Sequence, residues 1–243
     1  MNKSDYIRKW DRFQRRWENY YTKRFKAALK IQVEQQIKNG YITSDPILHV
    51  LEDLYKRCGV AWAHATQVVI KKQEVKGRMP MGFSERIVEL MRQYYGIEIT
   101  EDANQITQYT REVIQNVLSE AAITGWSFDE IVRQLQSNSE LGAMRARRIA
   151  RTEVVGASNA AAITNAKDTG VPMVKIWLAV RDNRTRHSHR LADDLTIPID
   201  EAFTIGGVKM MQPGVKKTPD GQQVPGAQII NCRCVLGFRV VKT

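Results

Sequence analysis

Hydrophobic residues recur with a helical period through the first part of the chain, and this regularity stops at Gly170 and Pro172. The Ala-rich segment 141–168 is the clearest case, since its composition favours a long helix. After Pro172 the pattern changes to short runs of β-branched and aromatic residues. The chain is therefore expected to be α+β: a helical N-terminal region followed by a small α+β domain with a C-terminal antiparallel sheet.

Capping residues divide the helical part. Ser4 and Thr100 are expected to cap helices, and Ser127 with Glu130 forms a capping box, in which the serine accepts a backbone N–H while the glutamate reaches back. Gly40 marks a helix end, because glycine commonly follows the last helical turn. The expected helices are 4–39, 45–75, 84–95, 100–121, 128–138 and 141–168, with a break at 76–80.

The strands are expected at 174–180, 203–205, 208–211 and 232–241. Gly206-Gly207 between the second and third predicts a tight hairpin, and a long turn-rich loop covers 213–226. The motifs described below begin after residue 126. The sequence therefore predicts two domains: a helical N-terminal region, 1–126, that contacts partners and DNA, and a second domain, 127–243.

Composition excludes several classes of protein. No run of about 18 apolar residues is present, and the N-terminus lacks the apolar core of a signal peptide, so neither a membrane span nor secretion is expected. The chain contains three cysteines, an odd number, which argues against a secreted disulfide scaffold. A soluble protein made in a reducing compartment is expected.

Positive charge is concentrated in two segments. The net charge is +11; residues 1–40 hold eleven Lys or Arg against four Asp or Glu, and residues 143–190 hold ten against three. Such clustering favours a polyanionic partner, here double-stranded DNA bound through phosphates without sequence preference, although a solvated helix surface is the simpler explanation. The residues expected to bind DNA or a partner are Trp10, Arg12, Arg15, Arg16, Trp17, Lys23, Arg145, Arg147 and Arg148.

Aromatic residues recur every three or four positions from Trp10 to Phe25, among these basic residues. Core packing or docking of a partner is expected for this stripe rather than base stacking, which needs exposed rings. Because the stripe is long, part of it is expected to remain available to a partner. Deleting residues 1–40 is accordingly expected to leave the domain beyond residue 128 folded.

Four consecutive motifs lie in the last third of the chain: ARTE at 150–153 followed by Asn and Ala, a strand with Trp177, D-x-R-T-R-x-S-H at 182–189, and NCRC at 231–234. Their order and spacing over about 128–240 resemble the C-terminal domain of the phage minor head protein family typified by the F protein of phage Mu. One departure is visible, since the family usually has Asp-Gly after the histidine and this chain has Asp193-Asp194.

The resemblance implies a role in head morphogenesis. A protein of this family is expected to join the procapsid beside the portal protein, with capsid or scaffold proteins as further partners, and to lie inside the virion near packaged DNA after assembly in the host cytoplasm. It is further expected to affect DNA ejection. The N-terminal region, rather than the domain that carries the motifs, is expected to dock onto the portal, because aromatic residues and arginine are enriched at interfaces.

The polar residues of the motifs form a set that is expected to organise the C-terminal domain. We call this set the polar cluster; it comprises Arg151, Glu153, Asn159, Asp182, Arg184, Arg186, His189, Asn231, Cys232 and Cys234. Arginine forks pair with carboxylates, so a buried ion network is favoured. No catalytic residue is assigned.

The alternative is an enzyme that processes nucleic acid or acts as a toxin, with His189 or Glu153 as general base and the arginines as a phosphate clamp. No nucleophile elbow or phosphate-binding glycine loop supports it. An ADP-ribosyltransferase would be expected to carry Glu-x-Glu, which the chain lacks.

Cys232 and Cys234 are one residue apart in an expected strand, so both thiols would point to one face, at the far edge of disulfide geometry. With His189 as third ligand and Asp182 or His187 as fourth, they are candidates for a zinc site. Against zinc stands the absence of C-x₂-C spacing, and the alternative is a pair of buried thiols packed beside a histidine without any metal.

Overall fold

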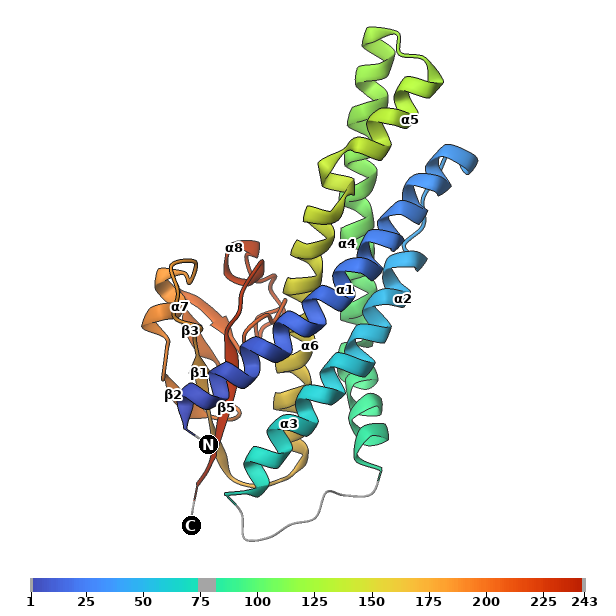
Figure 1. The fold of residues 1–243 in the computed structure, drawn as a ribbon. Helices are drawn as coiled ribbons and strands as arrows, with labels where there is room; N and C mark the ends of the chain where they lie inside the picture. Colours follow the sequence, from blue (N-terminus) through green and yellow to red (C-terminus); the bar gives the residue numbers. More distant parts are fainter. Residues whose placement is uncertain (1, 74–81, 242–243) are drawn as a thin grey trace. The chain divides into compact units, whose positions relative to one another are not determined.

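A computed structural model describes residues 2–73 and 82–241, and internal contacts divide the chain into two compact units. Unit 1 comprises Met1–Trp17, Leu54–Tyr94 and Arg151–Thr243, and unit 2 comprises Glu18–Asp53 and Tyr95–Ala150. Three long helices contribute residues to both units (Figure 1): α1 (Lys3–Asn39), α4 (Phe83–Thr124) and α6 (Ala143–Asp168). Contacts thus group the first 17 residues with the C-terminal segment. Independent folding of 1–126 and 127–243 stays a prediction.

The cap of helix α1 lies two residues before the predicted Ser4. The side chain of Asn2 accepts the backbone N–H of Asp5 at 2.8 Å, so Asn2 caps the helix. Its end agrees with the expectation, since Gly40 follows with φ of +77°, a conformation that favours glycine.

The second expected helix contains an interruption. Helix α2 (Asp45–Leu54) continues through a π-helical turn, Tyr55–Gly59, into α3 (Val60–Lys71). A Cβ atom on Gly59 would lie 3.3 Å from the Ala157 carbonyl oxygen, so glycine allows this turn to approach α6 closely. The expected end at Val75 and the break at 76–80 lie outside the described residues.

Helix α4 joins the two shorter helices expected at 84–95 and 100–121. Thr100 is not a cap; its hydroxyl donates to the Gly96 carbonyl at 3.1 Å, a bond that threonine makes inside a helix. Helix α5 (Phe128–Ser137) begins as predicted, with Ser127 Oγ accepting the Glu130 N–H at 3.3 Å. The Glu130 carboxylate binds Arg133 and Gln134 instead of reaching back. A short 3₁₀ turn, Ser139–Leu141, then leads into α6.

The sheet after α6 confirms the expected α+β class. Strand β1 (Met173–Leu178) lies between β2 (Thr196–Pro198) and β5 (Val235–Val240), antiparallel to both, and β3 (Phe203–Ile205) pairs with β4 (Val208–Met210) in a hairpin (Figure 1). The sequence missed β2 and the helices α7 (His187–Leu191) and α8 (Gly226–Ile229), all too short for a clear period. Strand β5 begins at Val235, so the prediction that Cys232 and Cys234 lie in a strand is wrong.

The core of unit 1 gathers residues from both ends of the chain. Trp10 of α1 is fully buried, its ring lies 4.8 Å from that of Trp62, and its Nε1 donates to the Arg233 carbonyl at 2.7 Å. Tyr6 is also buried and donates to the Leu236 carbonyl at 2.8 Å. The start of α1 is therefore part of the packing that supports β5.

Unit 2 has its own small hydrophobic core and a buried arginine, Arg145. The core residues are Val33, Ile42, Ile114, Val117, Leu135 and Leu141.

Among the described residues, no helix is long and apolar enough to cross a membrane.

Candidate functional site

His189 of α7 and the two cysteines before β5 form a compact buried group, which we call the His–Cys cluster. His189 Nδ1 lies 3.4 Å from Cys234 Sγ and 3.6 Å from Cys232 Sγ, and all three side chains are 2% exposed or less. The three ligand atoms lie within 4.8 Å of one another. The contact expected between His189 and both sulfurs is therefore present.

The ring of His189 is held in one orientation. Its Nε2 lies 3.1 Å from Gln228 Oε1, which can only accept, so Nε2 carries the hydrogen and donates. The Trp177 ring packs edge to face against the imidazole at 5.4 Å. Consequently the lone pair of Nδ1 faces the two sulfurs.

The two thiols titrate as a pair. The hydrogen bond with the Cys234 thiol lowers the pKa of Cys232 well below that of a free cysteine, and contact with His189 acts in the same direction. The same contact and burial raise the pKa of Cys234. The backbone N–H of Cys234 also donates to Cys232 Sγ at 3.4 Å.

Two asparagines fix the backbone around the cysteines. Asn159 of α6 is fully buried; it donates to the Cys234 carbonyl at 3.2 Å and accepts the Leu236 N–H at 2.9 Å. Asn231 has φ of +59°, and its N–H donates to Thr152 Oγ1 at 3.1 Å. Asparagine adopts this backbone conformation more readily than most residues, which accounts for its place in the turn before Cys232.

Asp182 and His187 do not belong to the His–Cys cluster. Asp182 accepts hydrogen bonds from the Arg233 guanidinium, the Arg184 N–H and Thr185 Oγ1. The guanidinium of Arg233 holds the pKa of Asp182 well below its usual range. His187 is exposed, and in the described parts of the chain only His189 and the two cysteines form this ligand group. Neither residue supplies the expected fourth ligand, because the Asp182 carboxylate binds Arg233 and the His187 side chain is exposed.

The two carboxylates of the polar cluster pair with different cations. Glu153 is buried and pairs with Lys216 at 2.8 Å, whereas Arg151 contacts the Asn231 side chain at 3.4 Å. Arg186 donates to the Ile230 carbonyl, and Arg184 lies exposed, 3.7 Å from Asp182. Glu153 thus pairs with Lys216, and Asp182 pairs with Arg233 and Arg184.

Sequence reasoning missed three residues that complete these contacts: Arg233, Gln228 and Lys216. Arg233 lies between the two cysteines in NCRC, so its place in the motif is a signal that could have identified it. Gln228 and Lys216 come from the long loop and its short helix, where no periodic pattern indicates which side chains face inward.

The turn after α7 forms despite the change from Gly to Asp. Asp194 has φ of +70°, and its N–H donates to the Trp177 carbonyl at 2.8 Å. Aspartate tolerates this conformation better than most residues. Asp193 accepts the Ala179 N–H at 2.9 Å and pairs with Lys3 at 2.8 Å, so the turn is also tied to α1.

Two of the residues expected to bind DNA or a partner are buried. Trp10 belongs to the core of unit 1, so it is corrected to a packing residue. Arg145 is 3% exposed, donates to Thr110 Oγ1 at 2.9 Å and to the Ile106 carbonyl at 2.7 Å, and lies over the Tyr109 ring. Burial lowers its pKa to about 10. It holds α6 against α4 within unit 2.

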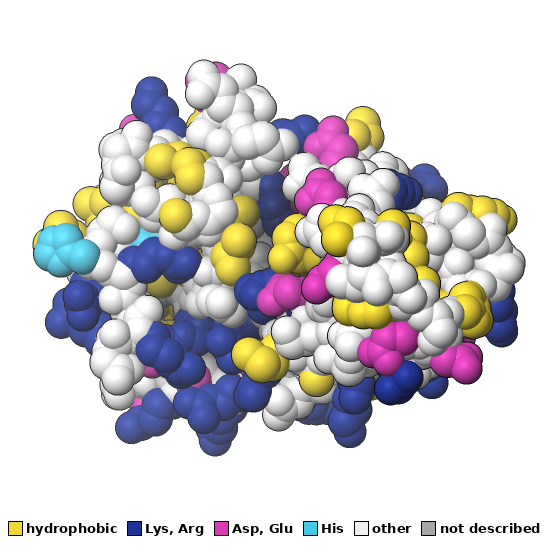
Figure 2. All heavy atoms as spheres, turned by 90° about the horizontal axis from the view of Figure 1, so that it is seen from above, with side chains coloured by type: hydrophobic (Ala, Val, Ile, Leu, Met, Phe, Trp, Pro, Cys, Tyr) yellow, Lys and Arg dark blue, Asp and Glu magenta, His cyan; other side chains and the backbone are white. Residues whose placement is uncertain are grey.

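The other basic residues of that group are accessible to different degrees. Arg147 pairs with Glu18 at 2.9 Å and Arg148 with Glu140 at 2.9 Å, while half-buried Trp17 faces Arg57. Figure 2 shows one face on which many Lys and Arg side chains are visible and several gather together. The exposed residues of the group on α1 are Arg12, Arg15, Arg16 and Lys23.

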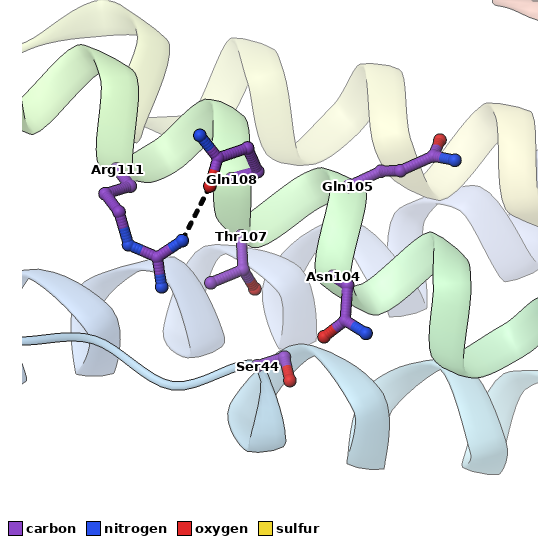
Figure 3. Close-up of a pocket in the computed structure, with 6 residues that line it drawn as sticks. All are labelled: Ser44, Asn104, Gln105, Thr107, Gln108 and Arg111. Atoms are coloured by element: carbon purple, nitrogen blue, oxygen red, sulfur yellow. Dashed lines mark hydrogen bonds between the residues drawn. The ribbon is translucent and has the colours of Figure 1, made fainter.

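Unit 2 carries a polar hollow of about 370 Å³ lined by Ser44 and by residues of one face of α4 (Figure 3). Arg111 Nη1 donates to Gln108 Oε1 at 2.7 Å across its edge. The remaining lining residues are Asn104, Gln105 and Thr107, none of which ionises. The hollow offers hydrogen-bonding groups but no acid–base pair.

Comparison with known proteins places these features in a family. A model described as "Phage Mu protein F like protein" matches residues 112–237, just over half of the chain. The chain is 31% identical to minor head protein GP7 of Bacillus phage SPP1 over 51% of its own length and 40% of that protein. It is 30% identical to NAD(+)–arginine ADP-ribosyltransferase EFV of Enterococcus faecalis over 54% of its length and 27% of that protein.

YqbB of Bacillus subtilis is 31% identical over 52% of this chain and 41% of its own length. The chain thus spans well under half the length of these curated relatives. No solved structure matches it. Because the family model covers more than half of the sequence and contains the helix α6, the D-x-R-T-R-x-S-H motif and NCRC, the chain belongs to the Phage Mu protein F-like family.

Proposed function

We propose that this protein acts in phage head morphogenesis as a minor head protein. The observation that carries this proposal is the family match over residues 112–237, together with the similarity to a protein named as the minor head protein of phage SPP1. The buried state of the His–Cys cluster supports a structural use of the motif, since all three side chains are 2% exposed or less.

The finer part of the proposal concerns partners and location. The protein joins the procapsid beside the portal, contacts capsid or scaffold proteins, and lies in the virion next to packaged DNA, whose ejection it affects. Exposed arginines on α1 support a non-specific phosphate contact, because Arg12 and Arg16 have accessible guanidinium groups while Arg145 does not. The portal-docking surface is assigned to α1 and excludes Trp10, which is covered within unit 1.

An enzymatic role receives less support. The relative named as an ADP-ribosyltransferase is matched over only 27% of its length, and the present chain has no Glu-x-Glu pair. Both ring nitrogens of His189 are engaged, Nε2 with Gln228 and Nδ1 with the two sulfurs, so neither is free to take a proton from a substrate. We therefore propose that the chain is not an enzyme.

Procapsid incorporation tests the proposal. The full chain is co-expressed with the portal, scaffold and major capsid proteins of the same phage, and particles are separated by sedimentation. The protein is expected in the procapsid fraction, and its omission is expected to lower the yield of normal heads. Absence from particles combined with an unchanged head yield would contradict the role.

A matched pair of variants tests the docking surface. Arg12→Glu with Arg16→Glu is expected to reduce incorporation, while Lys30→Glu with Lys38→Glu, the same number of charge reversals at other exposed positions of α1, is expected to leave it unchanged. Incubation with labelled NAD⁺ and protein extract is expected to give no transfer of ADP-ribose. Transfer that depends on His189 would favour the enzyme instead.

A further inference from the structure

The spacing within the His–Cys cluster matches the edges of a zinc tetrahedron. Zinc bonds of about 2.3 Å to sulfur and about 2.0–2.1 Å to nitrogen, at a tetrahedral angle, place sulfur and nitrogen about 3.6 Å apart. The observed separations from His189 Nδ1 are 3.6 Å to Cys232 Sγ and 3.4 Å to Cys234 Sγ. The two nitrogen–sulfur separations are therefore already at ligand spacing, and the three donor atoms lie within 4.8 Å of one another.

The hydrogen bonds of the cluster favour a bound cation over two thiols packed beside the histidine without a metal. The single lone pair of Nδ1 faces two sulfurs, so it can accept a hydrogen from only one of them. A divalent cation at the centre would bind all three lone pairs at once. The N–H at Nε2 donates to Gln228 Oε1, which is the outer contact that metal-binding histidines commonly make.

The surroundings provide support and an open side. Asn159 holds the backbone on both sides of Cys234, so the position of that thiol does not depend on the metal. A small hollow reaches all three donor residues and is otherwise lined by Val180, Arg184, Thr185, Arg186, Asn231 and Arg233. None of these is a usual zinc ligand, so the fourth position is left to solvent.

We propose that His189, Cys232 and Cys234 bind one zinc ion, with solvent from this hollow as the fourth ligand. Two thiolates balance the charge of the ion, and the metal ties α7 to the segment before β5. This site is independent of the role in head assembly, and it attaches the D-x-R-T-R-x-S-H motif to NCRC.

Cobalt substitution tests the site directly. Full-length protein is purified with a reducing agent, stripped of metal with a chelator and titrated with Co²⁺. One Co²⁺ per chain is expected, with thiolate-to-cobalt charge-transfer bands and the visible bands of four-coordinate cobalt, and Zn²⁺ is expected to displace it. Added thiocyanate is expected to shift the visible bands, because the fourth position is exchangeable; an unchanged spectrum would refute the solvent ligand.

Variants separate this site from adventitious binding. Cys232→Ser and Cys234→Ser are each expected to weaken binding by more than 100-fold, and Gln228→Leu by about 10–100-fold, since it removes only the outer hydrogen bond. Cys58→Ser is the matched control, because Cys58 is equally buried but contacts Ser158 Oγ at 3.4 Å and lies outside the cluster. Circular dichroism reports whether each variant is folded.

Absence of charge-transfer bands in the wild-type protein would overturn the proposal and leave a packed thiol pair. An equal loss of binding in Cys58→Ser would also overturn it. If the cysteine variants do not fold, Gln228→Leu still tests the proposal, because it keeps all three ligands and is expected to weaken metal binding.

Discussion

Lys175 lies on the core face of the central strand β1 and is fully buried, an unusual position for a lysine. Its ammonium group donates to the Met211 carbonyl at 2.8 Å and lies 5.2 Å from the centre of the Phe203 ring. Burial lowers its pKa from 10.5 to about 7, and nearby Lys167 acts in the same direction, whereas Asp200 and Glu201 oppose it. Replacing Lys175 with Met keeps the length of the side chain and removes the charge.

The sign and size of the effect follow from proton binding. Between pH 7 and 10.5 the unfolded chain keeps a proton on Lys175 that the folded chain releases, so the free energy of unfolding rises with pH in this window. At about 1.36 kcal/mol per pH unit, the cost of burying Lys175 is about 5 kcal/mol at pH 6 and about 2 kcal/mol at pH 9. Lys175→Met also leaves the Met211 carbonyl without its donor, which costs about 1–3 kcal/mol at every pH.

Lys175→Met is therefore expected to be more stable than the wild type at pH 6, and this advantage is expected to shrink by about 3 kcal/mol by pH 9. Urea unfolding followed by tryptophan fluorescence at pH 6, 7, 8 and 9, with a reducing agent, measures the difference. Lys30→Met, at an exposed position, serves as the control and is expected to show no such trend. A difference between Lys175→Met and wild type that stays constant from pH 6 to 9 would refute the reasoning.

Three further outcomes are expected. Trp10→Ala should lower the free energy of unfolding by about 3–5 kcal/mol in urea titrations, because a fully buried ring is lost; a loss below about 1 kcal/mol would place the ring outside the core. Asn159→Leu should cost about 2–5 kcal/mol, since it unpairs buried backbone groups beside β5, and an equally stable variant would contradict that role. Arg12→Ala with Arg16→Ala should reduce the slope of log affinity for DNA against log salt by about 2, whereas Arg145→Lys should leave it unchanged, and equal slopes in all three proteins would remove α1 from the DNA contact.

Local patterns predicted most helices and the main strands of the chain, because helical period, capping residues and turn glycines are properties of short segments. Ser127 and Gly40 act as their sequence indicated. Thr100 did not, since a threonine hydroxyl can bind a carbonyl inside a helix as well as cap one. Here the helix continues without a break from residue 96 to residue 100, so Thr100 is an internal residue. The short elements β2, α7 and α8 depend on long-range packing for their existence and carry no period of their own.

The His–Cys cluster was predictable because its two residue types are rare and their spacing matches a known motif. The residues around the cluster were not predictable. Asp182 pairs with Arg233 and not with the cluster, and this pairing depends on the tertiary fold. The same holds for Trp10 and Arg145. Their residue types indicate an interface or a phosphate contact, and only tertiary packing shows that one lies in a core and the other between helices.

The grouping of the first 17 residues with the C-terminal segment has a consequence for synthesis. Tyr6 and the carbonyl that it contacts are 230 residues apart in the chain. At translation rates of about 5–20 residues per second, the start of α1 leaves the ribosome roughly 10–50 s before the strand that covers it. During that interval Tyr6 and Trp10 lack their cover on the nascent chain. A product truncated before β5 would therefore have a first helix without its contacts to that strand.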